Sequence, residues 1–131
     1  MIKDTGLKKL DLVGFDMCLM AQMETAAEIA DLAQVMVASQ ALEPGDGWPY
    51  EQILPYFGQE SLGVRRLGAQ IVDAYGKHYG GRQEQVATLS AIDLGEVQKL
   101  AETMNNLAAK MSRSVPASWA AISRAFFYSE A

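Results

Sequence analysis

Residues 10–20 have the sequence Leu-Asp-Leu-Val-Gly-Phe-Asp-Met-Cys-Leu-Met, an apolar run that ends in an aspartate and the only cysteine of the chain. Its residues are almost continuously apolar from Leu10 to Phe15, which is typical of a parallel strand covered on both faces. Helical spacing of the apolar side chains then predicts a helix from about Leu19 to Leu32. The Cys18 thiol is therefore expected where a strand, a turn and a helix meet.

This position of Cys18 is compatible with two interpretations. Catalytic sites of open α/β sheets lie at the carboxyl ends of the strands. A thiol near the amino end of a helix is also favoured as the thiolate, the form that attacks carbonyl carbon. A lone cysteine is nevertheless more often a small buried hydrophobic residue. Position alone leaves the role of Cys18 open.

The composition is typical of a globular protein and excludes several classes of function. The chain has 131 residues, of which 50% are hydrophobic and 21% charged, and its net charge is −5. The acidic balance, without a cluster of Lys and Arg, argues against a nucleic-acid partner. No stretch approaches the roughly 20 apolar residues of a membrane helix, so no membrane partner is expected. A single cysteine and a single histidine exclude an internal disulfide and a cysteine/histidine zinc cluster.

The sequence predicts one α/β domain over residues 1–131, incomplete, with about three strands and flanking helices. Strands are expected at residues 10–15, 34–39 and 85–92, and helices at about 19–32, 50–57, 62–79, 93–111 and 116–126, with Ser61 as the N-cap of the third helix. The first two strands and their helix form a βαβ unit, whose right-handed crossover puts both carboxyl ends at one edge of the sheet. Cys18 and the loop after Ser39 should therefore face one cleft.

That loop is rich in Gly and Pro over residues 42–50, which excludes regular structure and fixes a specific backbone path. A plain connection between strand and helix is one interpretation of it. Trp48 and Tyr50 either line a cleft or cap the sheet. The only histidine, His78, is expected in the last turn of a helix, where a favourable contact with the helix dipole is the simplest explanation.

Two elements of the sequence together resemble the clostripain family of cysteine peptidases, in the clan of caspases, gingipains and legumain. The first is Asp-Met-Cys-Leu-Met at residues 16–20, and the second is Glu-Pro-Gly-Asp-Gly-Trp-Pro-Tyr at residues 43–50. The resemblance covers residues 10–95, where residues 89–94 are similar to a later family strand. It implies a caspase-like parallel-sheet sandwich, of which this chain is the nucleophile-bearing part.

The resemblance also implies roles for individual residues in an endopeptidase that cleaves after Arg, or less readily Lys. Cys18 is the implied nucleophile, and its backbone N–H is a plausible oxyanion donor. Asp16 and Asp46 match family positions in the S1 pocket, where carboxylates pair with guanidinium. The loop borders this pocket, so Trp48 is expected to contact the substrate. A structural alternative for Asp16 is a turn carboxylate that caps the following helix.

A catalytic histidine is expected upstream of the cysteine by the resemblance, yet none of the 17 residues before Cys18 is histidine. The implied partners are therefore a peptide or protein substrate with Arg or Lys at the cleavage site, and a histidine-bearing upstream segment or light chain. The chain is then an excerpt, a piece of a split enzyme or a relative that has lost the dyad. We favour an excerpt, inactive or nearly so on its own.

Two other functions stay open, and no cofactor is expected. A non-catalytic caspase-like module can bind peptides or a partner chain, and a hydrolase or acyltransferase can use Cys18 on a small substrate. Calcium activates some relatives, but the sequence has no Asp-x-Asp-x-Asp-Gly loop of the calcium-binding kind. The resemblance favours an extracellular or periplasmic location.

Overall fold

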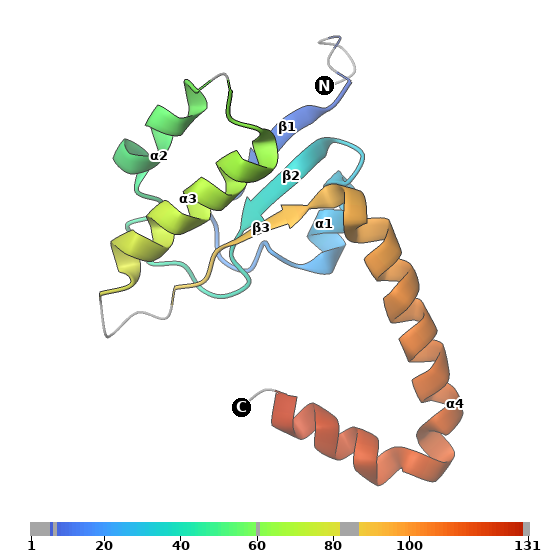
Figure 1. Ribbon diagram of the computed structural model, residues 1–131. Coiled ribbons are helices and arrows are strands. Elements are labelled where there is room, and N and C mark those ends of the chain that lie inside the picture. Colours follow the sequence, from blue (N-terminus) through green and yellow to red (C-terminus); the bar gives the residue numbers. More distant parts are fainter. Residues whose placement is uncertain (1–5, 7, 60, 82–86, 130–131) are drawn as a thin grey trace. The chain divides into compact units, whose positions relative to one another are not determined.

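Three strands form one sheet in the order β1-β2-β3, with β1 at Leu10–Gly14, β2 at Ala33–Ala38 and β3 at Ser90–Asp93 (Figure 1). The coordinates are a computed structural model that describes residues 6, 8–59, 61–81 and 87–129. Parallel pairing of β1 with β2 confirms the βαβ unit. Within the described residues β1 is an edge strand, since β2 is its only neighbour.

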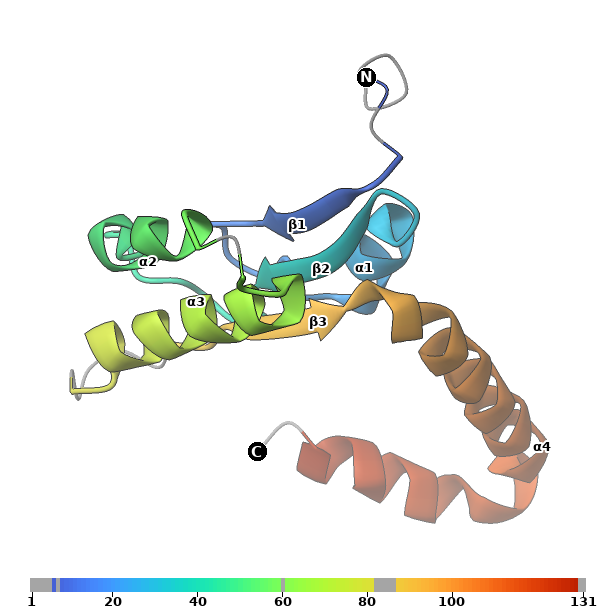
Figure 2. The ribbon, with the colours of Figure 1, turned by 45° about the horizontal axis from the view of Figure 1, so that its top comes forward.

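The alternation of side chains along β2 explains why residues 35–38 are all apolar. Val35 and Val37 pack into a core formed with α2 (Tyr50–Phe57) and α3 (Val64–Tyr79). Met36 and Ala38 pack into a second core, which includes Ala26 of α1 (Met23–Ile29). Figure 2 shows α2 and α3 on one side of the sheet and α1 on the other. Both faces of β2 are therefore covered. In β1, for which the apolar pattern predicted this, Leu12 packs partly into the first core and Leu10 and Val13 partly into the second.

The third strand runs antiparallel to β2, so the sheet is mixed and not purely parallel as expected. Helix α3 explains this direction. Its first turns lie near the end of β3, where Arg65 pairs with Asp93 at 2.7 Å. Its last residue, Tyr79, contacts Gly47, which follows the carboxyl end of β2. Because α3 runs along β2 in the same direction, the next strand must return the opposite way.

Helix α1 is shorter than predicted, and this changes the surroundings of Cys18. The predicted helix over residues 19–32 begins only at Met23. Leu19 has a φ of 62°, which a right-handed helix cannot include. The N–H groups of Leu19 and Ala21 donate instead to Ala41 and Ser39 across the turn. Cys18 is therefore not in the first turn of a helix, and the predicted start of this helix at about Leu19 was wrong.

The remaining boundaries follow the sequence pattern with two exceptions. Helix α2 and the end of α3 before Gly80 are as predicted, but Gly63 is the N-cap of α3 and Ser61 is not. Strand β3 begins at Ser90, because its partner β2 ends at Ala38, opposite that residue. Of the predicted strand over residues 85–92, residues 85 and 86 lie outside the described residues.

A short 3-10 helix, η2 (Leu94–Glu96), leads from β3 into α4 (Val97–Ser129). Asp93 caps η2 by accepting a hydrogen bond from the Gly95 N–H at 3.0 Å. The Gly95 N–H and Arg65 together hold the pKa of Asp93 below its ordinary value. This carboxylate therefore stays ionised and fixes the turn out of the sheet.

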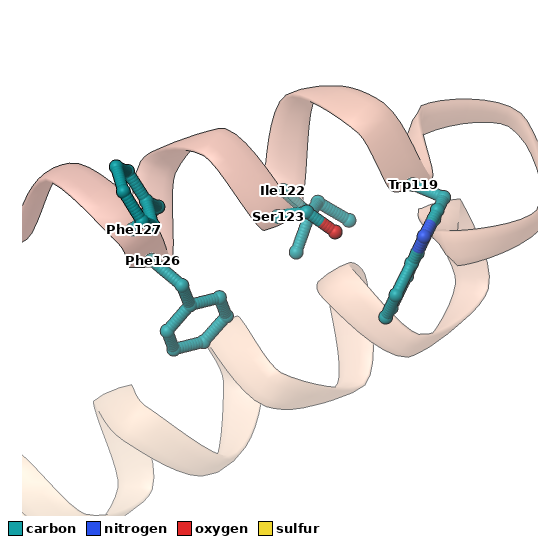
Figure 3. Close-up of a pocket in the computed structure, with 5 residues that line it drawn as sticks. All are labelled: Trp119, Ile122, Ser123, Phe126 and Phe127. Atoms are coloured by element: carbon teal, nitrogen blue, oxygen red, sulfur yellow. The ribbon is translucent and has the colours of Figure 1, made fainter.

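The chain divides into two compact units, residues 1–97 and residues 98–131. The second consists of α4, which is interrupted at Ser118 (φ −127°) into the two helical stretches that the sequence predicted. On its second stretch Trp119 and Phe126 extend from the same side of the helix and help line an apolar hollow (Figure 3). Among the described residues, no helix has the length and apolar character needed to cross a membrane.

The close approach of Gly14 to Trp48 generates a stability prediction. A Cβ at Gly14 would lie 2.8 Å from the indole ring, so Gly14→Ala should lower the free energy of unfolding by about 1–3 kcal/mol. A Cβ at Gly76 of α3 would meet nothing within 4 Å, so Gly76→Ala should raise it by as much as about 1 kcal/mol. Urea denaturation measures both changes, and equal effects of the same sign would contradict this packing.

Candidate active site

Cys18 lies in a turn directly beyond β1, and its side chain is exposed. The Phe15 N–H donates to Val37 O at 2.9 Å, which continues the pairing with β2 past the end of β1. The chain then turns back at residues 17–19, and the Leu19 N–H donates to Ala41 O at 3.1 Å. These bonds fix the turn that presents the thiol at the carboxyl edge of the sheet.

The thiol faces residues 39–49, which we call the β2–α2 loop. The Glu43 N–H donates a hydrogen bond to Cys18 Sγ at 3.2 Å, and the Glu43 carbonyl oxygen lies 4.0 Å from the same sulfur. The prediction that Cys18 and the loop after Ser39 face one cleft is therefore confirmed. Together the turn and the loop line a hollow of about 380 Å³, formed by Asp16, Met17, Cys18, Glu43, Pro44, Gly45, Asp46 and Gly47.

The carboxylate of Asp16 joins the turn to the loop. Its Oδ2 accepts hydrogen bonds from the Trp48 N–H at 3.2 Å and from the Tyr50 hydroxyl at 2.8 Å. Gly47, with a φ of 69°, packs so closely that a Cβ there would lie 2.9 Å from the same carboxylate. The two hydrogen bonds give Asp16 a role between the turn and the β2–α2 loop, which differs from the alternative that it caps α1.

The other two predicted substrate-binding residues lie in different surroundings. Asp46 is exposed and lines the same hollow as Asp16 and Cys18. Trp48 is only 7% exposed and belongs to the core beneath α2 and α3, which matches the interpretation that it caps the sheet. The structure thus gives Trp48 a supporting position under the loop, and its contact with substrate stays a prediction.

Glu43 is a site residue whose side chain the sequence did not single out. Its Oε1 accepts a hydrogen bond from Trp48 Nε1 at 3.4 Å, while its Oε2 is buried without a donor among the described residues. Burial raises the pKa of Glu43 to about 7, the Trp48 hydrogen bond opposes this rise, and the neighbouring Asp16 carboxyl adds to it. The one sequence signal was an acidic residue at the start of the Gly- and Pro-rich motif.

Two tyrosines of α3 lie beneath the β2–α2 loop. The Tyr79 hydroxyl donates to Gly47 O at 2.6 Å. The Tyr75 hydroxyl is buried and has no hydrogen-bond partner among the described residues. Burial, followed by the charge of Glu43, raises the pKa of Tyr75 to about 12, so this phenol is neutral at all ordinary pH values. Burial and its hydrogen bond to Asp16 likewise raise the pKa of Tyr50.

His78 lies in the last turn of α3, as predicted. Its Nδ1 is 3.4 Å from Gln52 Nε2 of α2, and its ring packs edge-on against Tyr79 with 4.7 Å between ring centroids. These contacts place the imidazole against α2 and Tyr79. No three His, Cys, Asp or Glu side chains within the described residues are grouped so as to hold a metal ion.

An exposed thiol at the carboxyl edge of a buried α/β sheet, beside a fixed carboxylate, defines a candidate cysteine-nucleophile site. The model of the clostripain family, peptidase family C11, matches residues 3–130, and the chain therefore belongs to that family of cysteine peptidases. No curated protein sequence matches the chain.

Solved structures of bacterial cysteine proteases share the fold. A clostripain from Bacteroides thetaiotaomicron ATCC 29148, in complex with the peptide inhibitor BTN-VLTK-AOMK, has 25% identity and a TM-score of 0.67 over 80% of this chain and 44% of that one. The secreted C11 cysteine protease "iotapain" from Bacteroides thetaiotaomicron has 23% identity and a TM-score of 0.69, over 83% of this chain and 29% of that one. A B. fragilis cysteine protease has 21% identity and a TM-score of 0.64, over 74% of this chain and 42% of that one. The chain thus spans less than half the length of each.

The two tyrosines of α3 provide a matched pair of variants. Tyr79→Phe should lower the free energy of unfolding by about 1–2 kcal/mol, because it leaves the part-buried carbonyl of Gly47 without this donor. Tyr75→Phe removes a hydroxyl that has no partner among the described residues, so it should be neutral or slightly stabilising. Denaturation curves of both variants check this difference, and a larger loss in Tyr75→Phe would contradict it.

Proposed function

We propose that this chain is the nucleophile and specificity part of a cysteine endopeptidase that cleaves after Arg or Lys. The observation that carries the proposal is that the Cys18 thiol and the Asp16 and Asp46 carboxyl groups line one hollow. Peptides are the substrate class that the family implies. A related clostripain has been solved with a peptide inhibitor, which supports the same substrate class here.

Cys18 acts by covalent catalysis. Its thiolate attacks the carbonyl carbon of the scissile peptide bond, and the Cys18 backbone N–H donates to the oxygen as it becomes negative. Collapse of the tetrahedral intermediate breaks the C–N bond and leaves a thioester on Cys18. The leaving amine takes a proton from a histidine, which then assists water in hydrolysing the thioester.

Substrate specificity comes from the charge of the hollow. A guanidinium group carries a delocalised positive charge and paired N–H donors, which match carboxylate oxygens. Asp16 is held in one orientation by Trp48 and Tyr50, so its carboxylate is ready to pair with a basic side chain. Asp46 supplies a second carboxyl group at the rim of the same hollow.

The histidine of the dyad is provided by a segment outside this sequence, upstream or on a separate light chain. In the described residues β1 is an edge strand, and an unpaired strand edge offers backbone groups to which another strand can bind. His78 is a poor substitute, because its contacts are with Gln52 and Tyr79. An extracellular or periplasmic location is part of the proposal, supported by the secreted relative.

A second candidate function is a non-catalytic module that binds peptides or a partner chain. The observation in its favour is that β1 is an edge strand within the described residues, so its unpaired backbone groups can bind another chain. It predicts recognition of basic side chains without bond cleavage, and the same assay distinguishes it from the peptidase.

Reconstitution tests the proposed dyad. This chain alone should not cleave an arginyl amide substrate, because it lacks the general base. Adding the histidine-bearing segment should give turnover, and Cys18→Ala in the reconstituted pair should abolish it. Release of a fluorescent amine measures the rate. A correctly assembled pair that binds the substrate without turnover would contradict catalysis and favour the binding module.

Removing the charge of Asp16 or Asp46 should lower the preference for arginyl substrates more than it lowers the rate of the chemical step. In the reconstituted enzyme, Asp16→Asn and Asp46→Asn should each lower kcat/KM for arginyl substrates by about 10- to 100-fold, because each removes a carboxylate from the guanidinium site. Turnover of a norleucyl substrate, with an uncharged side chain of similar length, should change little.

The exposed Asp31 provides the matched control, and Asp31→Asn should leave both substrates unaffected. Unchanged preference for Arg over norleucine in Asp16→Asn and Asp46→Asn would refute the pocket assignment.

A further inference from the structure

The proposed peptidase uses Cys18, Asp16 and Asp46, but it assigns no role to the Glu43 side chain in the same hollow. Glu43 forms hydrogen bonds with two residues of the site, one through its backbone and one through its side chain. Its N–H donates to Cys18 Sγ at 3.2 Å, and its Oε1 accepts from Trp48 Nε1 at 3.4 Å. A residue in this position affects the nucleophile and the specificity pocket together.

The free oxygen of this carboxyl group indicates what it does. Glu43 Oε2 is buried, and no donor reaches it among the described residues. The neighbouring carboxylate, Asp16, is itself only an acceptor, and its Oδ2 already receives the Trp48 N–H and the Tyr50 hydroxyl. Two acceptors form a hydrogen bond with each other only when one of them carries a proton. Burial, a hydrogen bond with Asp16 and the charge of Asp16 all raise the pKa of Glu43, and the last two disfavour ionisation of both groups.

We propose that Glu43 is a third carboxyl group of the S1 pocket, which shares one proton with Asp16 while the pocket is empty and releases it when a cationic side chain enters. The proton leaves to solvent, only this O–H bond is broken, and the Glu43–Asp16 pair gains one negative charge beside the hollow. This inference rests on the proposed function, because it requires that the hollow binds basic side chains.

The other titratable groups around Glu43 do not oppose this assignment. Asp16 and Cys18 face it from the turn after β1, and Tyr50 and Tyr75 interact with it from α2 and α3. Burial raises the pKa values of both tyrosines, so they stay neutral while Glu43 titrates. The pKa of Glu43 is raised by burial and by Asp16 to about 7, which makes its proton available to a ligand at neutral pH.

The direction of the pH dependence follows because cation binding and ionisation of Glu43 are linked. A cation in the pocket binds more tightly when Glu43 is ionised, so affinity must rise as the pH increases through about 7. Glu43→Gln keeps the size of the side chain and an acceptor for Trp48, but it cannot ionise. This variant should therefore retain the low-pH affinity over the whole range.

The test uses the full-length enzyme with Cys18→Ala, which removes turnover and the titration of the thiol. The probe is N-acetyl-arginine amide, and N-acetyl-citrulline amide is the uncharged control of the same shape. Between about pH 5.5 and about pH 8.5, the affinity for the arginine amide should rise about tenfold. In Cys18→Ala/Glu43→Gln, this affinity should change by less than about threefold over the same pH range. The control variant Cys18→Ala/Glu28→Gln is altered at an exposed glutamate of α1 and should behave like the parent.

Calorimetry of the Cys18→Ala parent near pH 7, in two buffers with different ionisation enthalpies, gives a second readout that does not depend on how well Glu43→Gln folds. Binding of the arginine amide should release a fraction of a proton, and binding of the citrulline amide should release none. Arginine binding with no proton release, or with the same pH dependence after Glu43→Gln, would overturn the role of Glu43 alone. No arginine binding at any pH would overturn the S1 pocket, and this inference with it.

Discussion

The site depends on the hydrogen bonds that Asp16 accepts from the Trp48 N–H and the Tyr50 hydroxyl. Backbone bonds from Leu19 and Ala21 join the turn after β1 to the start of the β2–α2 loop, at Ala41 and Ser39. The Asp16 carboxylate, two residues before the cysteine, joins the turn to the end of the loop at Trp48 and to Tyr50 of α2. The same group that orders the loop is thereby placed in the hollow beside the thiol, which links the folding of the loop to the formation of the site.

The core beneath the loop makes this connection rigid. Trp48 is buried against the sheet, its indole N–H donates to Glu43, and Tyr79 of α3 donates to the carbonyl of Gly47. The first bond joins two residues of the loop to each other, and the second fixes Gly47 of the loop to α3. Buried carboxyl and phenol groups of this kind are costly unless they are hydrogen-bonded or neutral. The raised pKa values of Glu43 and Tyr75 are consistent with that rule, since burial favours the neutral form of both groups.

The parts of the fold that the sequence predicted are those determined by local pattern. Continuous apolar residues identified β1 and β2, and the 43–50 motif together with Asp16 and Cys18 identified the family. The start of α1 was not predictable from apolar spacing, because the positive φ of Leu19 and the bonds across the turn interrupt the helix. The direction of β3 depends on how α3 packs along the sheet, which no local pattern encodes. The role of Glu43 depends on burial and on a neighbouring carboxylate 27 positions earlier, Asp16, and both are tertiary features.

We propose that Cys18 is a nucleophile whose pocket selects basic side chains. The most direct measurement is the site of covalent attachment, by peptide mass spectrometry, of an arginyl electrophile and its norleucyl analogue on the full-length enzyme. The arginyl reagent should modify Cys18, and the norleucyl reagent should modify it far more slowly. Modification at another residue, or equal rates for the two reagents, would contradict this proposal.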